Sequence, residues 1–158
     1  MILRALLAFL VLPGVAAFIV PPIFASFDPW RTGVFWPGAL VMLPGMVLLL
    51  WCVQDFYVSG KGTLAPWDPP KKLVVVGLYR HMRNPMYVGV LTLVVGWSLL
   101  LLSPILIFCA AILAFDFHIR VLKHEEPWLK SQFGSEWQQY SSEVSRWFPR
   151  LPPWSGGS

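Results

Sequence analysis

Charged residues are scarce in this chain of 158 residues. Lys and Arg number 12 and Asp and Glu number 8, so only 13% of the residues are charged, whereas a soluble domain carries about 25%. Hydrophobic residues make up 56% of the chain, and the mean hydropathy is +0.62. A soluble core of this size would not need nine Trp and four long apolar runs. The bilayer is therefore the expected solvent.

The residues that several other kinds of site require are also few. Cys52 and Cys109 both lie inside apolar runs without metal-ligand spacing, so buried free thiols are expected. His81, His118 and His124 form no convergent set of three or four ligands, and no metal site is predicted. The basic residues lie between apolar spans and form no separate basic domain. Nucleic acid is therefore not an expected partner, and the net charge of +4 suits anionic lipid headgroups.

The four apolar runs predict an all-α, polytopic membrane protein with four transmembrane helices. A kink is expected in the first run at Pro13 and Gly14. The last two runs are joined only by Ser103 and Pro104, which forces a very tight turn and an antiparallel helical hairpin. The runs cover residues 2–24, 34–58, 85–102 and about 105–119. A single membrane domain follows, with two spans in 1–58, a cytoplasmic loop at 59–84 and the hairpin at 85–122.

Residues 123–150 are predicted to form an amphipathic cytoplasmic tail. Leu129, Phe133 and Trp137 recur at helical spacing, but Gly134 interrupts the pattern. Two short interfacial helices fit this better than a fifth span. The polar end of the fourth run is expected at or just below the headgroups.

The basic residues are distributed unequally between the two sides of this predicted topology. With four spans only Arg31 falls on one side, and all the others fall on the opposite side. Because loops rich in Lys and Arg stay in the cytoplasm, both termini and the long loop are predicted to be cytoplasmic. The residues on that side are Arg4, Lys61, Lys71, Lys72, Arg80, Arg83, Arg120, Lys123, Lys130, Arg146 and Arg150.

The concentrated polarity on the cytoplasmic side lies in residues 77–89 and 118–126. Asn84 is a good N-cap and Pro85 suits the first turn of a helix. A helix N-terminus with Arg83 nearby would hold an anionic group such as a carboxylate. Because the hairpin brings its two cytoplasmic ends together, Glu125 and Glu126 are expected near it. An acid pair facing arginines suits a zwitterionic ligand.

Plainer interpretations of the same residues stay open at this point. Arg80 and Arg83 also fit ordinary positive-inside anchors, and Tyr87 fits an interfacial belt aromatic. Glu125 and Glu126 also fit solvated acids at the start of a helix, which the helix dipole favours.

The motifs in the second half of the chain resemble a known family, the integral membrane methyltransferases. This family includes isoprenylcysteine carboxyl methyltransferases and phospholipid N-methyltransferases. It carries a Gly-Pro-Tyr-Arg segment, an Arg-His-Pro-x-Tyr-x-Gly segment, a Glu-Glu pair, a Phe-Gly and a Val-x-Arg-x-x-Pro ending. Leu78 departs from the usual proline and Asn84 from the usual histidine, although asparagine still donates a hydrogen bond. The matching residues are Gly77, Tyr79, Arg80, Arg83, Pro85, Tyr87, Gly89, Glu125, Glu126, Leu129, Phe133, Gly134, Trp137, Tyr140, Val144, Arg146 and Pro149.

The resemblance implies an enzyme with S-adenosylmethionine as methyl donor and a lipid-like acceptor, either an isoprenylcysteine-type carboxylate or a phospholipid amine. Tyr140 and Arg146 are the candidate catalytic residues, with Arg146 placed to steer an anionic acceptor group. No Gly-rich fingerprint follows a strand, which excludes a Rossmann-type methyltransferase. The candidate cofactor-binding residues are Tyr79, Arg80, Arg83, Asn84, Tyr87, Gly89, Glu125 and Glu126.

Two other functions remain as alternatives. One is a non-catalytic membrane scaffold or receptor built on the hairpin. The other is a transporter, which the lack of internal repeat symmetry and of charged residues at mid-span makes a poorer fit. The sequence does not decide between the carboxylate and the amine acceptor.

Overall fold

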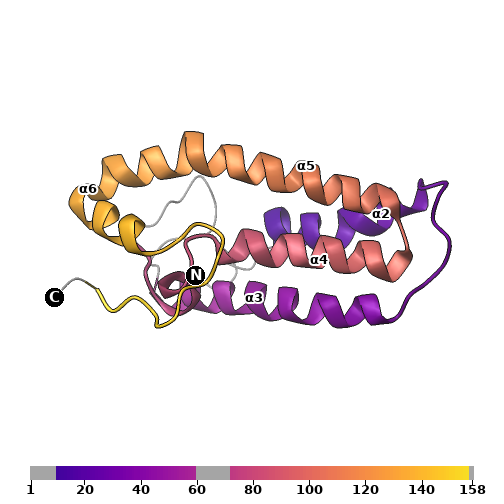
Figure 1. Ribbon diagram of the computed structural model, residues 1–158, viewed down its shortest axis with the longest axis horizontal. Helices are drawn as coiled ribbons and strands as arrows, with labels where there is room; N and C mark the ends of the chain where they lie inside the picture. The colour runs from indigo at the N-terminus through magenta and orange to yellow at the C-terminus, as the bar shows by residue number, and fades with distance from the viewer. Residues whose placement is uncertain (1–9, 60–71, 157–158) are drawn as a thin grey trace.

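The structure is a bundle of helices that run along one long axis (Figure 1). It is a computed structural model that describes residues 10–59 and 72–156, with side chains at 14–55 and 72–156. All regular elements within these ranges are helical, which confirms the predicted all-α class. They are the π-helical η1 (Leu10–Ile19), α2 (Val20–Ser26), α3 (Pro37–Ser59), the 3-10 helix η2 (Gly77–Arg80), α4 (Pro85–Leu101), α5 (Pro104–Arg120), the π-helical η3 (Val121–Glu125) and α6 (Glu126–Glu143).

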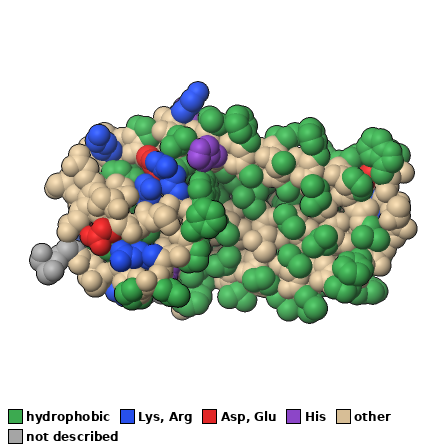
Figure 2. Space-filling model, viewed as in Figure 1, with side chains coloured by type: hydrophobic (Ala, Val, Ile, Leu, Met, Phe, Trp, Pro, Cys, Tyr) green, Lys and Arg blue, Asp and Glu red, His purple; other side chains and the backbone are tan. Residues whose placement is uncertain are grey.

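Two stretches of helix are long and apolar enough to cross a membrane. They are Pro37–Asp55 and the stretch that begins at Pro104, while Gly14–Ser26 and Pro85–Leu101 are apolar but shorter. Large apolar side chains such as Leu40, Phe108 and Phe115 are about two thirds exposed. On the face shown in Figure 2, apolar side chains are spread over the surface away from the α6 end, whereas most of the charged side chains visible there lie toward that end. So much exposed apolar surface suits lipid rather than water. The number of crossings stays a prediction, and the first residues of the first predicted span lie outside the described ranges.

The predicted tight turn between the third and fourth helices is confirmed. Leu102 takes a left-handed conformation with φ of 47°, and the Ser98 hydroxyl donates to the Ser103 carbonyl at 2.8 Å. Asp28, from the connection after α2, accepts hydrogen bonds from the Ser103 hydroxyl and from the Ile105 amide at 3.1 Å. The Asp28 carboxylate thus satisfies one of the free amides at the start of α5 and fixes the hairpin to the neighbouring loop.

The fourth predicted run, about residues 105–119, agrees with α5 (Pro104–Arg120), but the helical structure does not end there. Helix continues from α5 through η3 into α6, and its backbone first departs from helical geometry at Gly134, where φ is 49° and ψ is −117°. Between these points only Pro127 disfavours a helix, because it has no N–H to donate to the carbonyl one turn earlier. The π-helical turn η3 ends two residues before this proline, and π-turns accommodate such a mismatch. Gly134 does break the helix as predicted, but only the segment after it is short.

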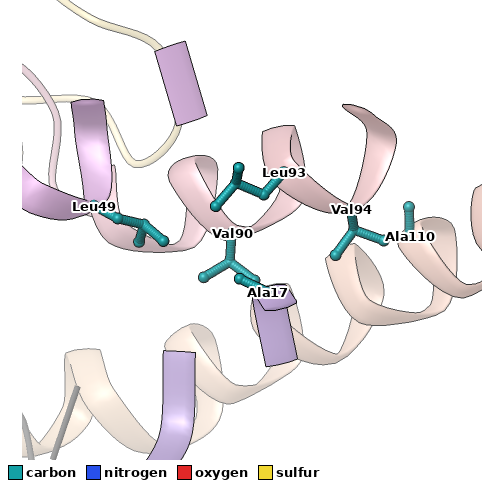
Figure 3. Packing of buried hydrophobic residues seen from close by; sticks show 6 residues of the cluster. All are labelled: Ala17, Leu49, Val90, Leu93, Val94 and Ala110. Atoms are coloured by element: carbon teal, nitrogen blue, oxygen red, sulfur yellow. The ribbon is translucent and has the colours of Figure 1, made fainter. Parts of the chain in front are cut away.

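A buried apolar cluster joins four elements (Figure 3). Leu93 and Leu49 have no exposed surface, and Val90 has 2%. The cluster draws on η1, α3, α4 and α5, and therefore fixes the position of the α4 N-terminus relative to α5. Its members are Ala17, Leu49, Val90, Leu93, Val94 and Ala110.

Glycines bring α3 and α4 into backbone contact. A Cβ atom at Gly38 would lie 2.2 Å from the Leu100 amide nitrogen, and one at Gly45 would lie 2.9 Å from the Gly89 carbonyl oxygen. At Gly96 a Cβ would lie 2.4 Å from the Met42 side chain. Small residues at such contacts allow helices in a membrane to pack through their backbones.

Replacement of Gly38 by alanine is expected to destabilise the protein by about 1–3 kcal/mol, the usual cost of forcing atoms into a packed contact. The clash is with backbone atoms, which cannot rotate away. Gly33→Ala is the matched control, since its Cβ would meet only the Leu102 side chain at 4.0 Å. Thermal unfolding in detergent measures both variants. Equal unfolding temperatures for the two would contradict this account of the contact.

Candidate active site

The start of α4 and the junction of η3 with α6 meet at the polar end of the bundle. The Arg83 Nη1 donates to Glu126 Oε1 at 2.8 Å, and the Tyr87 hydroxyl donates to Glu125. The hairpin therefore brings the acid pair to these two residues as the sequence predicted. The charged cluster consists of Arg83, Arg120, Glu125, Glu126 and Arg146.

Glu126 is the centre of this cluster. It accepts from Arg83 and, in a bidentate arrangement, from Arg146, with Nε at 2.6 Å and Nη2 at 2.9 Å. The hydrogen bond with Glu126 raises the pKa of the Arg146 guanidinium. Charge-assisted bidentate bonds of this kind are strong and fix geometry. Because three arginines face two glutamates, the cluster keeps one positive charge in excess.

Arg83 is the most deeply placed of the three arginines. Its side chain is 10% exposed, and its guanidinium lies 5.6 Å from the centre of the Trp137 ring, within the range of a cation–π interaction. Burial lowers the pKa of Arg83, although Glu126 opposes this shift. Within the described residues its Nε is buried without a hydrogen-bond partner. A buried unpaired donor calls for an acceptor from a ligand or water.

Glu125 lies on the more open side of the cluster, next to aromatic rings. Besides Tyr87 it contacts the Arg120 Nε at 3.2 Å. Tyr87 stacks on Phe117 with 4.2 Å between ring centres, and Trp147 lies 6.5 Å away. The site thus combines a charged half with an apolar aromatic half.

Sequence reasoning did not assign Phe117, His118, Arg120 and Trp147 to the site. The Trp147 indole donates to His118 Nδ1 at 3.3 Å, which ties the C-terminal segment to α5. A signal was present in the spacing, because His118 precedes Glu125 by two helical turns and so shares its face. Residues 118–126 were singled out for their polarity, but within that segment only Glu125 and Glu126 were given a role at the site.

The C-terminal segment 144–154 folds back over the start of α4. Main-chain bonds join Arg83 N to Ser145 O, Arg150 N to His81 O, and Trp154 N to Arg80 O, each at 2.9 Å. The Asn84 amide donates to the Arg146 carbonyl at 3.2 Å. The tail therefore lies against the segment that leads into α4, and Asn84 holds the residue that reaches Glu126.

The other predicted site residues hold the surrounding structure. The buried Tyr140 hydroxyl donates to the Tyr79 carbonyl at 2.7 Å, and the Arg80 Nε donates to the Trp154 carbonyl at 2.6 Å. Burial raises the pKa of the Tyr79 hydroxyl well above its usual value. Gly89 packs on α3, where a Cβ would lie 3.2 Å from Leu48 and Leu49 atoms. Contact of these four with a cofactor or acceptor stays a prediction.

A separate pocket of about 500 Å³ lies beside η2. Its polar side-chain lining consists of Arg80, Trp154 and Ser155, whereas the charged cluster does not line it. In the part of the chain that the structure describes, no three His, Cys, Asp or Glu side chains are placed to hold a metal ion, and both cysteines are free.

Together these features define an all-helical protein with long apolar helices and an arginine–carboxylate site at the mouth of a helical hairpin. The chain belongs to the phospholipid methyltransferase family, whose sequence profile matches residues 34–136. This match confirms the resemblance drawn from the motifs.

Curated relatives with similar sequences carry the name protein-S-isoprenylcysteine O-methyltransferase. The B protein of Arabidopsis thaliana is 35% identical over 78 residues, which cover 49% of this chain and 40% of the relative. A Dictyostelium discoideum protein is 26% identical over 132 residues, covering 82% of this chain and 53% of the relative. The chain thus spans about half or less of the length of these relatives. No solved structure matches it.

Proposed function

We propose that the protein transfers a methyl group from S-adenosylmethionine to a lipid-like acceptor at the charged cluster. The observation that carries this proposal is the pairing of Glu126 with Arg83 and Arg146 beside the pairing of Glu125 with Tyr87. Both pairs lie at the mouth of a hairpin, and all their residues except Arg146 fall within the segment 34–136 that matches the family. The names of the relatives support the reaction class, and the exposed apolar helices support a membrane-borne acceptor.

The charges of the cluster fit the methionyl part of this cofactor, which carries a carboxylate and an ammonium group. Arg83, with its unpaired Nε, and the N-terminus of α4 would hold the carboxylate. Glu125 would hold the ammonium group. When bound, the cofactor supplies an electrophilic methyl group on its sulfonium. The chain itself contributes alignment, and the aromatic half of the site with the folded-back tail excludes water.

Calorimetry with S-adenosylmethionine in detergent separates this proposal from a non-catalytic scaffold or receptor. The wild-type protein is expected to bind the cofactor with a defined stoichiometry. Heat no greater than that of adenosine alone would count against the enzyme and favour the scaffold.

The acceptor is proposed to enter from the bilayer, between helices, while the cofactor enters from the cytoplasm. The apolar surface of α5 reaches the charged cluster, so an acyl or prenyl chain can lie along it. A carboxylate acceptor needs only a cation such as Arg146 to place it, whereas an amine acceptor needs a base to take its proton. Both acceptor classes are compatible with the residues present.

Acceptors with one reactive head and different chain lengths test this entry route. Each buried methylene is expected to add about 0.8 kcal/mol to acceptor binding, so the specificity constant should rise steeply with length until the chain spans α5. Steady-state kinetics in mixed micelles at a fixed mole fraction measures it. Bilayer entry is wrong if a short soluble analogue reacts as well as the long-chain acceptor.

The site is proposed to face the cytoplasm, because the cluster lies on the side that carries eleven of the twelve basic residues in a four-span topology. A cysteine introduced at the exposed Ser142 reports on this orientation. Labelling of that cysteine by an impermeant reagent from outside intact cells would contradict it.

A further inference from the structure

Asp55, one turn before the end of α3, contacts η2. Its Oδ2 accepts a hydrogen bond from the Leu78 amide at 3.2 Å, and Trp51, one turn earlier on α3, is a second hydrogen-bonding partner. The charged cluster does not include Asp55, and the proposed reaction gives it no task. An acid at the end of an apolar helix is costly to retain without a function.

Gly77 lies directly against the Asp55 carboxylate, which leaves no room for a side chain at this position. Its φ is +50°, which side-chain-bearing residues rarely adopt. A Cβ atom at Gly77 would also lie 2.1 Å from the Asp55 Oδ2. The carboxylate therefore occupies the space that a side chain at residue 77 would fill, and the two residues form one joint.

The segment that follows this joint, residues 79–83, leads to Arg83 of the charged cluster. The Tyr79 carbonyl accepts from the buried Tyr140 hydroxyl, and the Arg80 Nε donates to the Trp154 carbonyl. Three residues further on, Arg83 pairs with Glu126. Contacts from α6 and the tail thus hold η2 on one side, and Asp55 holds it from α3.

We infer that Asp55 is a positioning residue that fixes η2 through the Leu78 amide, and thereby sets the place of Arg83 for cofactor binding. This inference rests on the proposed function. Without the Asp55 acceptor, the first turn of η2 loses its attachment to α3, and Arg83 samples positions away from Glu126. Affinity for S-adenosylmethionine falls, although Asp55 does not touch the cofactor.

Calorimetry with S-adenosylmethionine and thermal unfolding are measured on matched variants in detergent. Asp55→Ala and Gly77→Ala are both expected to weaken binding about tenfold, the scale of one lost hydrogen bond to a charged group. Asp55→Asn is expected to bind nearly as wild type does, since its amide oxygen still accepts from Leu78. Gln54→Ala, an exposed neighbour on α3, is the control and is expected to bind as wild type does.

Hydrogen exchange at the Leu78 amide adds a readout that needs no cofactor, and it is expected to speed up in Asp55→Ala and not in Asp55→Asn. Where Asp55→Ala fails to fold, Asp55→Glu, which displaces the carboxylate by one methylene, takes its place with the same expected loss. This inference alone would be overturned if Asp55→Ala bound S-adenosylmethionine as tightly as wild type does. It would also be overturned if Asp55→Asn bound the cofactor as weakly as Asp55→Ala. Absence of cofactor binding by wild type would overturn the proposed function and this inference with it.

Discussion

Replacement of Glu126 by alanine is expected to destabilise the protein by roughly 2–3 kcal/mol, somewhat below the cost of breaking a fully buried ion pair. Glu126 forms ion pairs with two arginines, and its side chain is only 17% exposed. Its removal leaves Arg83, which is 10% exposed, next to a second unpaired guanidinium. The same change is expected to abolish measurable methyl transfer, because it also frees the tail that Arg146 fastens.

Two further variants show whether the loss of stability in Glu126→Ala comes from the loss of its charge within the cluster. Glu126→Gln keeps the shape and one acceptor oxygen but removes the charge, so an intermediate loss of stability is expected. Glu143→Ala breaks an exposed pair with Arg150 at 3.4 Å, and such pairs contribute about 0–1 kcal/mol. Thermal and denaturant unfolding in detergent measure all three. If Glu126→Ala were no less stable than Glu143→Ala, the cluster would not organise this end of the protein.

Replacement of Arg83 by alanine is expected to weaken binding of S-adenosylmethionine by about 10- to 150-fold, which corresponds to about 1.5–3 kcal/mol for a hydrogen bond to a charged group. Arg83 is the least exposed arginine of the cluster, and its Nε has no partner among the described residues. Arg83→Lys keeps the charge but loses the planar fork, so most of the loss is expected there too. Calorimetry in detergent measures both.

A basic residue outside the cluster controls for general loss of charge. Lys130 is exposed on α6, and Lys130→Ala is expected to bind the cofactor as wild type does. Thermal unfolding of each variant shows whether it is folded at the temperature of the titration. Cofactor binding by a folded Arg83→Ala with wild-type affinity would place the binding site elsewhere.

The meeting of Arg83 and Tyr87 with the acid pair was predictable because it depends on short-range features. Ser103 and Pro104 leave room only for a tight turn, so the two helices must return side by side. Given that, the residues at their far ends become neighbours without any knowledge of packing. The order of the motifs then pointed to the same residues.

The parts that the sequence did not predict depend on long-range packing or on compensation within a helix. The fourth apolar run was expected to end near Ile119, but helix continues from α5 through η3 into α6 as far as Gly134. Gly89 was assigned to the cofactor from its motif, whereas its contact with α3 gives a packing reason for a glycine there. The joint of Asp55 with Gly77 links residues 22 positions apart, and no periodicity reports such a contact.

The most direct test of the central claim is transfer of label from methyl-labelled S-adenosylmethionine to lipid. Purified protein in vesicles of a total lipid extract, supplemented with a prenylated cysteine acceptor, is incubated with the labelled cofactor and extracted into organic solvent. The account predicts label in the organic phase with wild type and none above background with Arg83→Ala or Glu126→Ala. The account would be contradicted if all three proteins gave equal label in the organic phase. It would also be contradicted if wild type bound the cofactor but gave no label there.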